Sequence, residues 1–460
     1  MDPFARFLSG PACLLKSAFQ YWCLFIKFEA MRRAIFFTIV FFLGLLNKAE
    51  ANKDSSLRAC NAIYESDIRT IRLYQQSSGF PFPIMGLGSS DGLVLEFDQI
   101  KTERDFYQYT LIHCDAKWNP TTLSRTQFLD GMGYENIEIA QFSSGTLMQY
   151  THYSVALPSD QVKPKLSGNY LLLVYRNFDE KDIVFSRRMM VVANKGSVQM
   201  DVMQSRQVEL RSSHQQINFI FSKNSDYFMP NAMQDVKTVI LRNGEWNDAI
   251  AGLKPLFIVG NDIKYNYQIG NQMDGLNQYR FFDIRTFRSS TAGVKQRLNI
   301  DNQKHVILVN DKTRQFERYF NWADYNGRVL YDNRDLPTPQ GTSFESDYCF
   351  VHFTVLSESE LADPVYVFGE LSDWRVLESH RMYFNPDKKA YEAVIPLKQG
   401  YYNYIYGVLN PKNSKLHFNE FEGNHSETEN NYMVLVYHRN PGMGYDELIG
   451  YGLKNSTSVK

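Results

Sequence analysis

Apolar and polar residues alternate with a period of two along much of the chain, and no segment keeps the longer period of an amphipathic helix. In residues 93–98 the alternation places Leu93, Leu95 and Phe97 on one side of an extended segment. Residues 107–113 repeat the pattern after a polar connection of about eight residues. Short strands at this spacing predict an all-β fold made of tandem immunoglobulin-like, early-set β-sandwich domains.

Two segments have the pattern of a tyrosine corner. In residues 166–175 a tight turn leads into a nearly continuous apolar strand, and Tyr170 follows Gly168 by two residues. In immunoglobulin-like sandwiches the phenol of such a tyrosine hydrogen-bonds to upstream backbone. A looser version occurs in residues 397–402, before the strand-like segment 403–408. We therefore expect one corner in each of two sandwiches.

The length of 460 residues allows roughly three domains, at about 100 to 200 residues each. Composition shifts at residues 192–197 and 332–343 predict the boundaries between them. The expected blocks are an N-terminal sandwich at 60–195, a middle β domain at 198–335 and a C-terminal sandwich at 344–460.

The N-terminal residues predict export. Two arginines at positions 32 and 33 precede an apolar run at 34–46, which is too short to span a bilayer. An Ala-Glu-Ala cleavage pattern ends at residue 51, so 31–51 is predicted to be a signal peptide. Residues 1–30 are interpreted as an extension from a mis-assigned start codon. The alternative is that residues 1–30 are a cytoplasmic tail on a single anchor helix. If the signal peptide is cleaved as predicted, the mature chain is not expected to span the membrane.

Charge and cysteine content narrow the class of protein further. With 49 basic and 50 acidic residues, the chain lacks the charge excess of a nucleic-acid-binding protein. Three cysteines follow the predicted cleavage site: Cys60, Cys114 and Cys349. Either Cys60 and Cys114 form a disulfide or all three are isolated thiols, and the sequence leaves both alternatives open.

No catalytic, metal-binding or cofactor-binding residues are predicted. H-E-x-x-H and C-x-x-C do not occur in the sequence, and no segment offers a serine elbow between a strand and a helix. The glycine-rich segment 86–92 precedes a strand and is interpreted as a flexible turn. His113 and Cys114 leave an expected strand on opposite faces, which argues against a shared metal site. Paired carboxylates from distant strands stay possible for an unrecognised hydrolase.

The third block suggests one alternative function. Residues 365–374, 382–384 and 400–404 resemble the sandwich modules that accompany glycogen-active enzymes. Some of those modules stack sugars on tryptophan, so Trp374 is a candidate contact for a glycan or a protein partner. It is the single tryptophan of the block, and the same pattern also serves as a purely structural sandwich.

A set of motifs carries a more specific resemblance. The motifs are residues 111–120, 128–131, 150–153, 166–170 and 437–451. In their order and spacing they resemble the motifs of the type IX secretion system plug family of Bacteroidetes. The resemblance covers nearly all of residues 60–452. The motif residues singled out, expected to be mostly structural, are Trp118, Asp130, Gly131, Tyr153, Gly168 and Tyr170. Trp118 is expected in the core or as an exposed anchor, and Tyr150 and Tyr153 are expected on one face.

The resemblance implies a non-enzymatic periplasmic protein without a cofactor. Its partner is the large outer-membrane β-barrel translocon of the type IX secretion system, whose pore it closes from the periplasmic side. A broad surface rich in tyrosine and phenylalanine suits this role, because aromatic anchors dominate the energy of protein interfaces. The alternative is a secreted glycan-binding β-sandwich protein.

Overall fold

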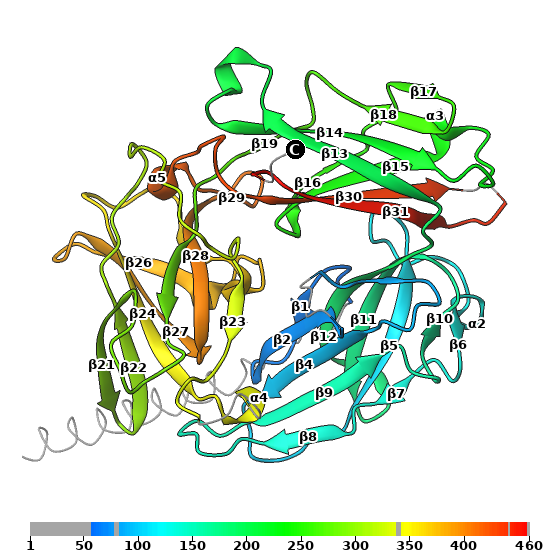
Figure 1. Cartoon of the computed structure of the whole chain (residues 1–460). Coiled ribbons are helices and arrows are strands. Elements are labelled where there is room, and N and C mark those ends of the chain that lie inside the picture. The colour runs from blue at the N-terminus through cyan, green and yellow to red at the C-terminus, as the bar shows by residue number, and fades with distance from the viewer. Residues whose placement is uncertain (1–56, 78–81, 337–341, 440–441, 458–460) are drawn as a thin grey trace, which may run out of the picture. The chain divides into compact units, whose positions relative to one another are not determined.

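The computed structural model describes residues 57–77, 82–336, 342–439 and 442–457 (Figure 1). The predicted extension at 1–30 and the predicted signal peptide at 31–51 lie outside these residues. The all-β prediction is confirmed: strands dominate, and the described helices contain no more than four residues each. No helix in the described part of the chain is long and apolar enough to cross a membrane.

The first sandwich contains the strands from Ala62 to Val192, which pair with one another. One sheet consists, in order, of β1 (Ala62–Ile63), β12 (Asp179–Val192), β11 (Gly168–Arg176), β5 (Tyr107–Cys114) and β7 (Glu135–Asn136), with β3 (Ile84–Gly86) parallel to β12. The facing sheet consists of β2 (Ile68–Gln75), β4 (Leu93–Gln99), β9 (Thr151–Leu157) and β8 (Ile139–Phe142). A separate two-stranded sheet is formed by β6 (Leu129–Asp130) and β10 (Lys163–Pro164). The short helix α2 (Arg125–Phe128) directly precedes β6.

The core of this sandwich forms where the sequence pattern predicts it. Leu93, Leu95 and Phe97 are fully buried along β4, while the residues between them face outward in part. The Phe97 ring stacks on Tyr153 with centroids 4.9 Å apart and meets Phe185 edge-on at 5.0 Å. Aromatic rings from both sheets therefore fill the space between them.

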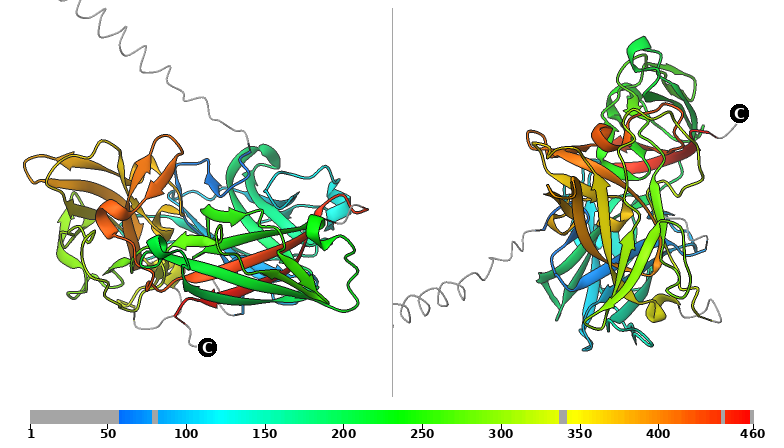
Figure 2. Two further views of the ribbon diagram at one scale, coloured as in Figure 1. Left: turned by 90° about the horizontal axis from the view of Figure 1, so that it is seen from above. Right: turned by 90° about the vertical axis from the view of Figure 1, so that its left-hand side faces the viewer.

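The second sandwich is discontinuous in sequence. One sheet consists of β13 (Gly196–Gln204), β14 (His214–Lys223), β18 (Asp262–Tyr265) and β17 (Phe257–Val259), with β19 (Gln272–Asp274) beside β14. The other consists of β16 (Glu245–Ala251), β15 (Val236–Arg242), β30 (Asn431–Arg439) and β31 (Asp446–Asn455). Two short helical elements connect strands: η1 (Val208–Leu210) and α3 (Ala232–Asp235). Figure 2 shows the red C-terminal strands lying among the green strands of this sandwich.

The third sandwich is one continuous sheet folded over its own core. Its order is β20 (Arg280–Asp283), β28 (Gly400–Asn410), β25 (Val365–Phe368), β26 (Arg381–Asn385), β27 (Ala390–Lys398), β24 (Tyr348–Leu356), β22 (Gln303–Leu308) and β21 (Val294–Ile300). β23 (Val329–Tyr331) and β29 (Lys415–His417) also pair with β28. Phe282 on β20 and Phe353 on β24, two strands that are not neighbours in this order, meet with ring centroids 5.6 Å apart. The short helical elements are η2 (Glu370–Ser372), η3 (Glu378–His380), α4 (Thr342–Glu345) and α5 (Asn419–Glu422).

Strand pairing corrects the contiguous blocks expected at 198–335 and 344–460. β20 to β23 come from the expected middle block but pair within the third sandwich. β30 comes from the expected last block but pairs with β15, where Val236 lies opposite His438. The third sandwich is therefore inserted between β19 and β30 of the second. Pairing between strands so far apart leaves no mark in local composition, so the sequence pattern did not reveal it.

Both predicted tyrosine corners are present. The Tyr170 hydroxyl donates a hydrogen bond to the carbonyl of Leu166 at 2.8 Å in the first sandwich. In the third sandwich, the Tyr402 hydroxyl donates to the carbonyl of Lys398, again four residues upstream. Each bond satisfies a carbonyl at the entry to a buried strand.

Candidate functional site

Trp118 lies at the contact between the first and second sandwiches. Its side chain is buried, and it meets Trp246 of β16 edge-on with centroids 4.9 Å apart. The guanidinium of Arg188 on β12 lies over both rings, at 4.5 Å and 5.1 Å. The preceding turn is held by Asp115, whose carboxylate accepts two backbone N–H groups. Trp118 is thus a buried core residue and not an exposed anchor, and the core cluster to which it belongs is formed by residues of both sandwiches.

The motif glycines lie where a side chain collides with its neighbours. Gly131 has φ +85°, and a Cβ there meets backbone atoms of Gln161 at 2.5 Å. Gly168 has φ +138°, and a Cβ there lies 2.8 Å from the His113 ring. Asp130 is exposed on β6, next to Gly131. The two glycines therefore shape turns of the first sandwich, and the Asp130 carboxylate pairs with the Lys165 ammonium at 3.3 Å.

Tyr153 and Tyr150 occupy different environments, so the expectation that they share a face is wrong. Tyr153 is buried in the first core and accepts the backbone N–H of Asp105 at 3.0 Å. Tyr150 precedes β9, and its hydroxyl donates to the carbonyl of Ser346 in the third sandwich at 2.7 Å. Residues three apart in an extended chain point to opposite sides, which is the physical reason.

The structure offers little for the catalytic and metal chemistry weighed from sequence. Cys60, Cys114 and Cys349 are free thiols. Across the described ranges, no group of three His, Cys, Asp or Glu side chains is arranged to hold a metal ion. Residues 88–92 have the spacing G-x-S-x-G, but they form an exposed turn that leads into strand β4. A serine elbow needs a helix after the serine, so this turn lacks that geometry.

A buried ionic network joins the first sandwich to the third. Asp98 on β4 accepts hydrogen bonds from the Lys398 ammonium at 2.6 Å and the Tyr348 hydroxyl at 2.7 Å. Its other oxygen lies 2.7 Å from the His152 ring. Burial raises the pKa of Asp98, but Lys398 and His152 outweigh burial and hold this pKa below its usual value. The ionised carboxylate is therefore the form that links the two domains.

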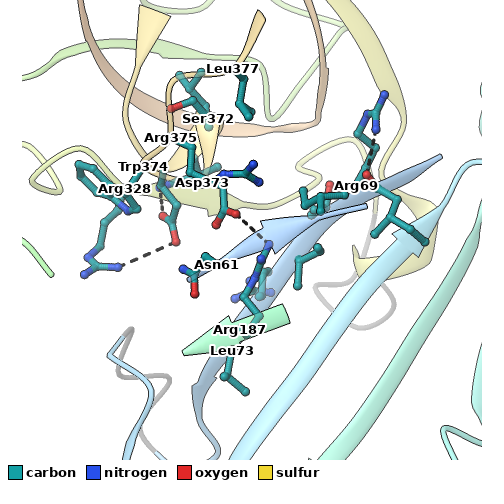
Figure 3. A pocket seen from close by; sticks show the side chains of 18 of the residues that line it. Asn61, Arg69, Leu73, Arg187, Arg328, Ser372, Asp373, Trp374, Arg375 and Leu377 are labelled. Carbon is teal, nitrogen blue, oxygen red and sulfur yellow. Dashed lines mark hydrogen bonds and ion pairs between the residues drawn. The ribbon is translucent and has the colours of Figure 1, made fainter. Parts of the chain in front are cut away.

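A cavity of about 680 Å³ opens where residues of all three sandwiches meet, and we call it the central cavity (Figure 3). Strands β1, β2 and β12 of the first sandwich line one side, and the η2 turn with strands β23, β27 and β28 of the third lines the other. The second sandwich contributes the turn at Asn243 and Gly244. Figure 3 shows Arg187 of β12 reaching toward Asp373, and their ion pair measures 3.1 Å.

Trp374, the candidate glycan contact, lies in the wall of the central cavity. Its half-buried ring meets Phe368 and Tyr279 edge-on, with centroids 5.8 Å and 6.3 Å away. Its carbonyl accepts a hydrogen bond from the Asn247 side chain of the second sandwich at 3.0 Å. The ring is therefore packed against neighbours, and the part of it that they leave uncovered lines the central cavity.

Sequence reasoning missed both the ionic network and the cavity. The available signal was charge in apolar strands: Arg187 and Arg188 interrupt β12, and Asp98 ends the apolar alternation of β4. Charged residues are almost never buried unless paired, so such positions predict a partner from elsewhere in the fold. The sequence alone does not say which residue that partner is.

The first sandwich exposes three large apolar side chains near one another, which we call the apolar rim: Phe106, Ile139 and Phe178, at 66%, 58% and 64% exposure. Strand pairing of Tyr107 with Arg176 brings Phe106 and Phe178 to the same end of the sheet. Arg104 lies over the Phe106 ring and donates to the carbonyl of Glu138, next to Ile139. Exposed apolar groups of this size mark interaction surfaces when they cluster.

The fold defines an all-β protein of three sandwiches. Residues 68–193 match the family model described as "Type 9 secretion system plug protein 1st domain". This range coincides with the first sandwich from β2 to β12, so this sandwich matches the first domain of the type 9 secretion system plug family. The resemblance drawn from sequence is confirmed.

Solved structures extend the likeness beyond the first sandwich. The crystal structure of a hypothetical protein from Parabacteroides merdae is 28% identical, with a TM-score of 0.82, and the match covers 87% of this chain and 100% of that one. Collagen adhesin from S. aureus is 9% identical with a TM-score of 0.09, over 86% of this chain and 94% of that one, and supports no conclusion. No curated protein matches the chain.

Proposed function

We propose that the chain is a non-enzymatic periplasmic plug that binds the periplasmic side of the type IX secretion translocon barrel and closes its pore. The observation that carries the proposal is the match of residues 68–193 to the plug's first domain. Binding of this kind requires a rigid surface and no reactive centre. The predicted signal peptide supports export to the periplasm, and association with the outer membrane follows from the partner.

The apolar rim is the proposed contact with the translocon. It belongs to the domain that carries the family match, and its aromatic side chains suit interface anchors. The second and third sandwiches reach this domain through buried contacts at Trp118 and Asp98. Those contacts fix the first sandwich on a larger body, as a pore-closing element requires.

The test is affinity purification of the mature chain, tagged at its C-terminus and expressed in its own host. We expect a very large outer-membrane barrel to co-purify in near-equal amount. Replacing Phe106 and Phe178 by Asp should lower its recovery by roughly tenfold or more, because two central anchors are lost. Deleting the gene should make the outer membrane permeable to large solutes.

The matched control is Phe316→Ala, which removes a more exposed aromatic from the third sandwich, at 91% exposure. Recovery of the barrel should stay unchanged with this variant. A clean monomer from the unaltered chain, or unchanged permeability in a deletion strain with an intact translocon, contradicts the proposed function. If Phe316→Ala lowered the recovery of the barrel and the replacements of Phe106 and Phe178 did not, the assignment of the apolar rim would be wrong.

A further inference from the structure

The lining of the central cavity has an excess of positive charge. Six arginines and Lys398 face three carboxylates; the arginines are Arg69, Arg72, Arg187, Arg188, Arg328 and Arg375, and the carboxylates are Glu65, Glu370 and Asp373. Two of the cations pair across the cavity wall, Arg187 with Asp373 at 3.1 Å and Arg328 with Glu370 at 3.9 Å. A cavity with walls of one charge sign and low dielectric constant concentrates ions of the opposite sign.

Three of the lining arginines have no ion pair with a carboxylate among the residues that the structure describes: Arg69, Arg188 and Arg375. Arg69 donates to the carbonyls of Ser66 and Ile68, and Arg188 donates to the carbonyl of Ala59. The Nη1 atom of Arg375 is buried without a hydrogen-bond partner within the described part of the chain. The three side chains are partly buried, and a cation in a low-dielectric cavity favours a nearby anion, so an anion in the cavity would stabilise this arrangement.

Ionisation of the lining agrees with this geometry. Burial lowers the pKa of Arg187 and Arg328, and lowers that of Arg188 to about 10. In all three cases burial outweighs the nearby negative groups. An oxyanion near these guanidinium groups would raise their pKa values and so oppose the effect of burial.

The backbone of the cavity wall next to Arg375 is locally strained. Asp373 and Trp374 have φ of 57° and 54°, in the left-handed region that residues with a Cβ rarely adopt. Such strain collects at ligand sites, where surrounding structure holds it in place. Figure 3 shows Asp373, Trp374 and Arg375 side by side on the loop that faces the strand carrying Arg187. The cavity volume of about 680 Å³ is that of a small-molecule site.

We propose that the central cavity binds a small molecule carrying a carboxylate or phosphate group beside a flat apolar portion. The anionic group lies against Arg375 and its neighbouring guanidinium groups, and the flat portion lies against Trp374. Arginine suits this role because its planar fork presents paired donors to carboxylate and phosphate oxygens. The site joins all three sandwiches, so ligand binding also strengthens their contact.

The test is isothermal titration calorimetry of the mature chain with inorganic phosphate, phenyl phosphate and benzoate. We expect one saturable site, with phenyl phosphate binding more tightly than inorganic phosphate. Whichever of phenyl phosphate and benzoate binds more tightly shows whether the site prefers a phosphate or a carboxylate group. Arg375→Gln should weaken binding by roughly tenfold or more, Arg375→Lys by less, and Trp374→Ala should remove the preference for phenyl phosphate over phosphate.

The matched control is Arg381→Gln, because Arg381 lies on the same sandwich but outside the cavity lining. This variant should bind like the unaltered chain. If Arg375→Gln fails to fold, Arg69→Gln replaces it, with the same expected weakening. Absence of saturable binding by all three probes at millimolar concentration overturns the proposal, as does equal loss with Arg381→Gln. The titration needs no translocon, so its failure is distinct from failure of the proposed function.

Discussion

At the scale of single residues, the chain buries ionisable side chains in several places, and burial brings the titration of the Glu245 carboxyl near neutral pH. Glu245 begins β16, next to the turn that lines the central cavity, and is 6% exposed. Burial raises its pKa to about 7 from the ordinary value of 4.5, with Arg242 opposing this shift and Asp248 adding to it. The folded protein therefore binds this proton more tightly than the unfolded chain does.

The consequence is a stability contribution that is present below pH 4.5 and is lost as the pH rises through about 7. A shift of this size corresponds to at most about 3 kcal/mol of unfolding free energy. We expect Glu245→Gln to flatten this pH dependence, because glutamine does not ionise. The stability of this variant relative to the unaltered chain should therefore be higher at pH 8.5 than at pH 5. Urea denaturation at both pH values measures it. The exposed Glu103→Gln serves as control, and a parallel pH dependence in Glu245→Gln and the unaltered chain would refute this assignment.

At the scale of elements, the turn after β6 depends on a glycine that both bends the chain and lies close to its neighbours. Gly131→Ala adds a Cβ at φ +85° and 2.5 Å from the Gln161 backbone, so backbone strain and collision act together. Gly145→Ala adds a Cβ at φ +70° with nothing within 4 Å, so strain acts alone. We expect Gly131→Ala to lose about 1–3 kcal/mol more unfolding free energy than Gly145→Ala, measured by urea denaturation. Equal losses would show that the close approach near β10 carries no energetic weight.

At the scale of the whole molecule, the network around Asp98 links two domains through buried charge. Asp98→Asn leaves the Lys398 ammonium buried without a counter-charge, and we expect a loss of about 3–5 kcal/mol of unfolding free energy. Asp98→Asn combined with Lys398→Met should recover much of this loss, because a neutral pair of similar volume needs no compensation. Denaturation of the single and double variants measures the coupling.

The control for this network is Glu180→Gln, which breaks the half-exposed pair with Arg125 at 2.8 Å. Exposed pairs contribute only about 0–1 kcal/mol, so this variant should be close to the unaltered chain. Additive losses from Asp98→Asn and Lys398→Met would mean that the two charges do not depend on each other. The domain contact would then rest on the apolar packing around it.

Much of the fold could be predicted because the decisive signals are local. The alternation in residues 93–98 became β4, with Leu93, Leu95 and Phe97 inside. The spacing of Gly168 and Tyr170 predicted a corner whose bond spans only four residues. Period and turn chemistry act over a few residues, so they can be read from the chain without knowing its neighbours.

The candidate sites could not be predicted in the same way, because their parts come from distant segments. Asp98 and Lys398 meet across 300 positions, and Arg187 meets Asp373 from another sandwich. The resemblance of the third block made Trp374 a candidate contact for a glycan or a partner, but it did not show that Phe368 and Tyr279 pack against the ring. Burial of a particular side chain depends on which domains meet, and local pattern does not specify that.

The all-β class, the positions of several strands, the two tyrosine corners and the resemblance to the plug family can be read from the sequence. The return of β30 and β31 to the sheet of β15, which makes the third sandwich an insertion in the second, appears only in the folded chain. The same is true of the contact between domains that Trp118 seals and of the charged side chains that surround a shared cavity. The reason is physical: alternation fixes which way each side chain points, whereas the choice of pairing strand is made by backbone hydrogen bonds and packing between residues far apart in sequence.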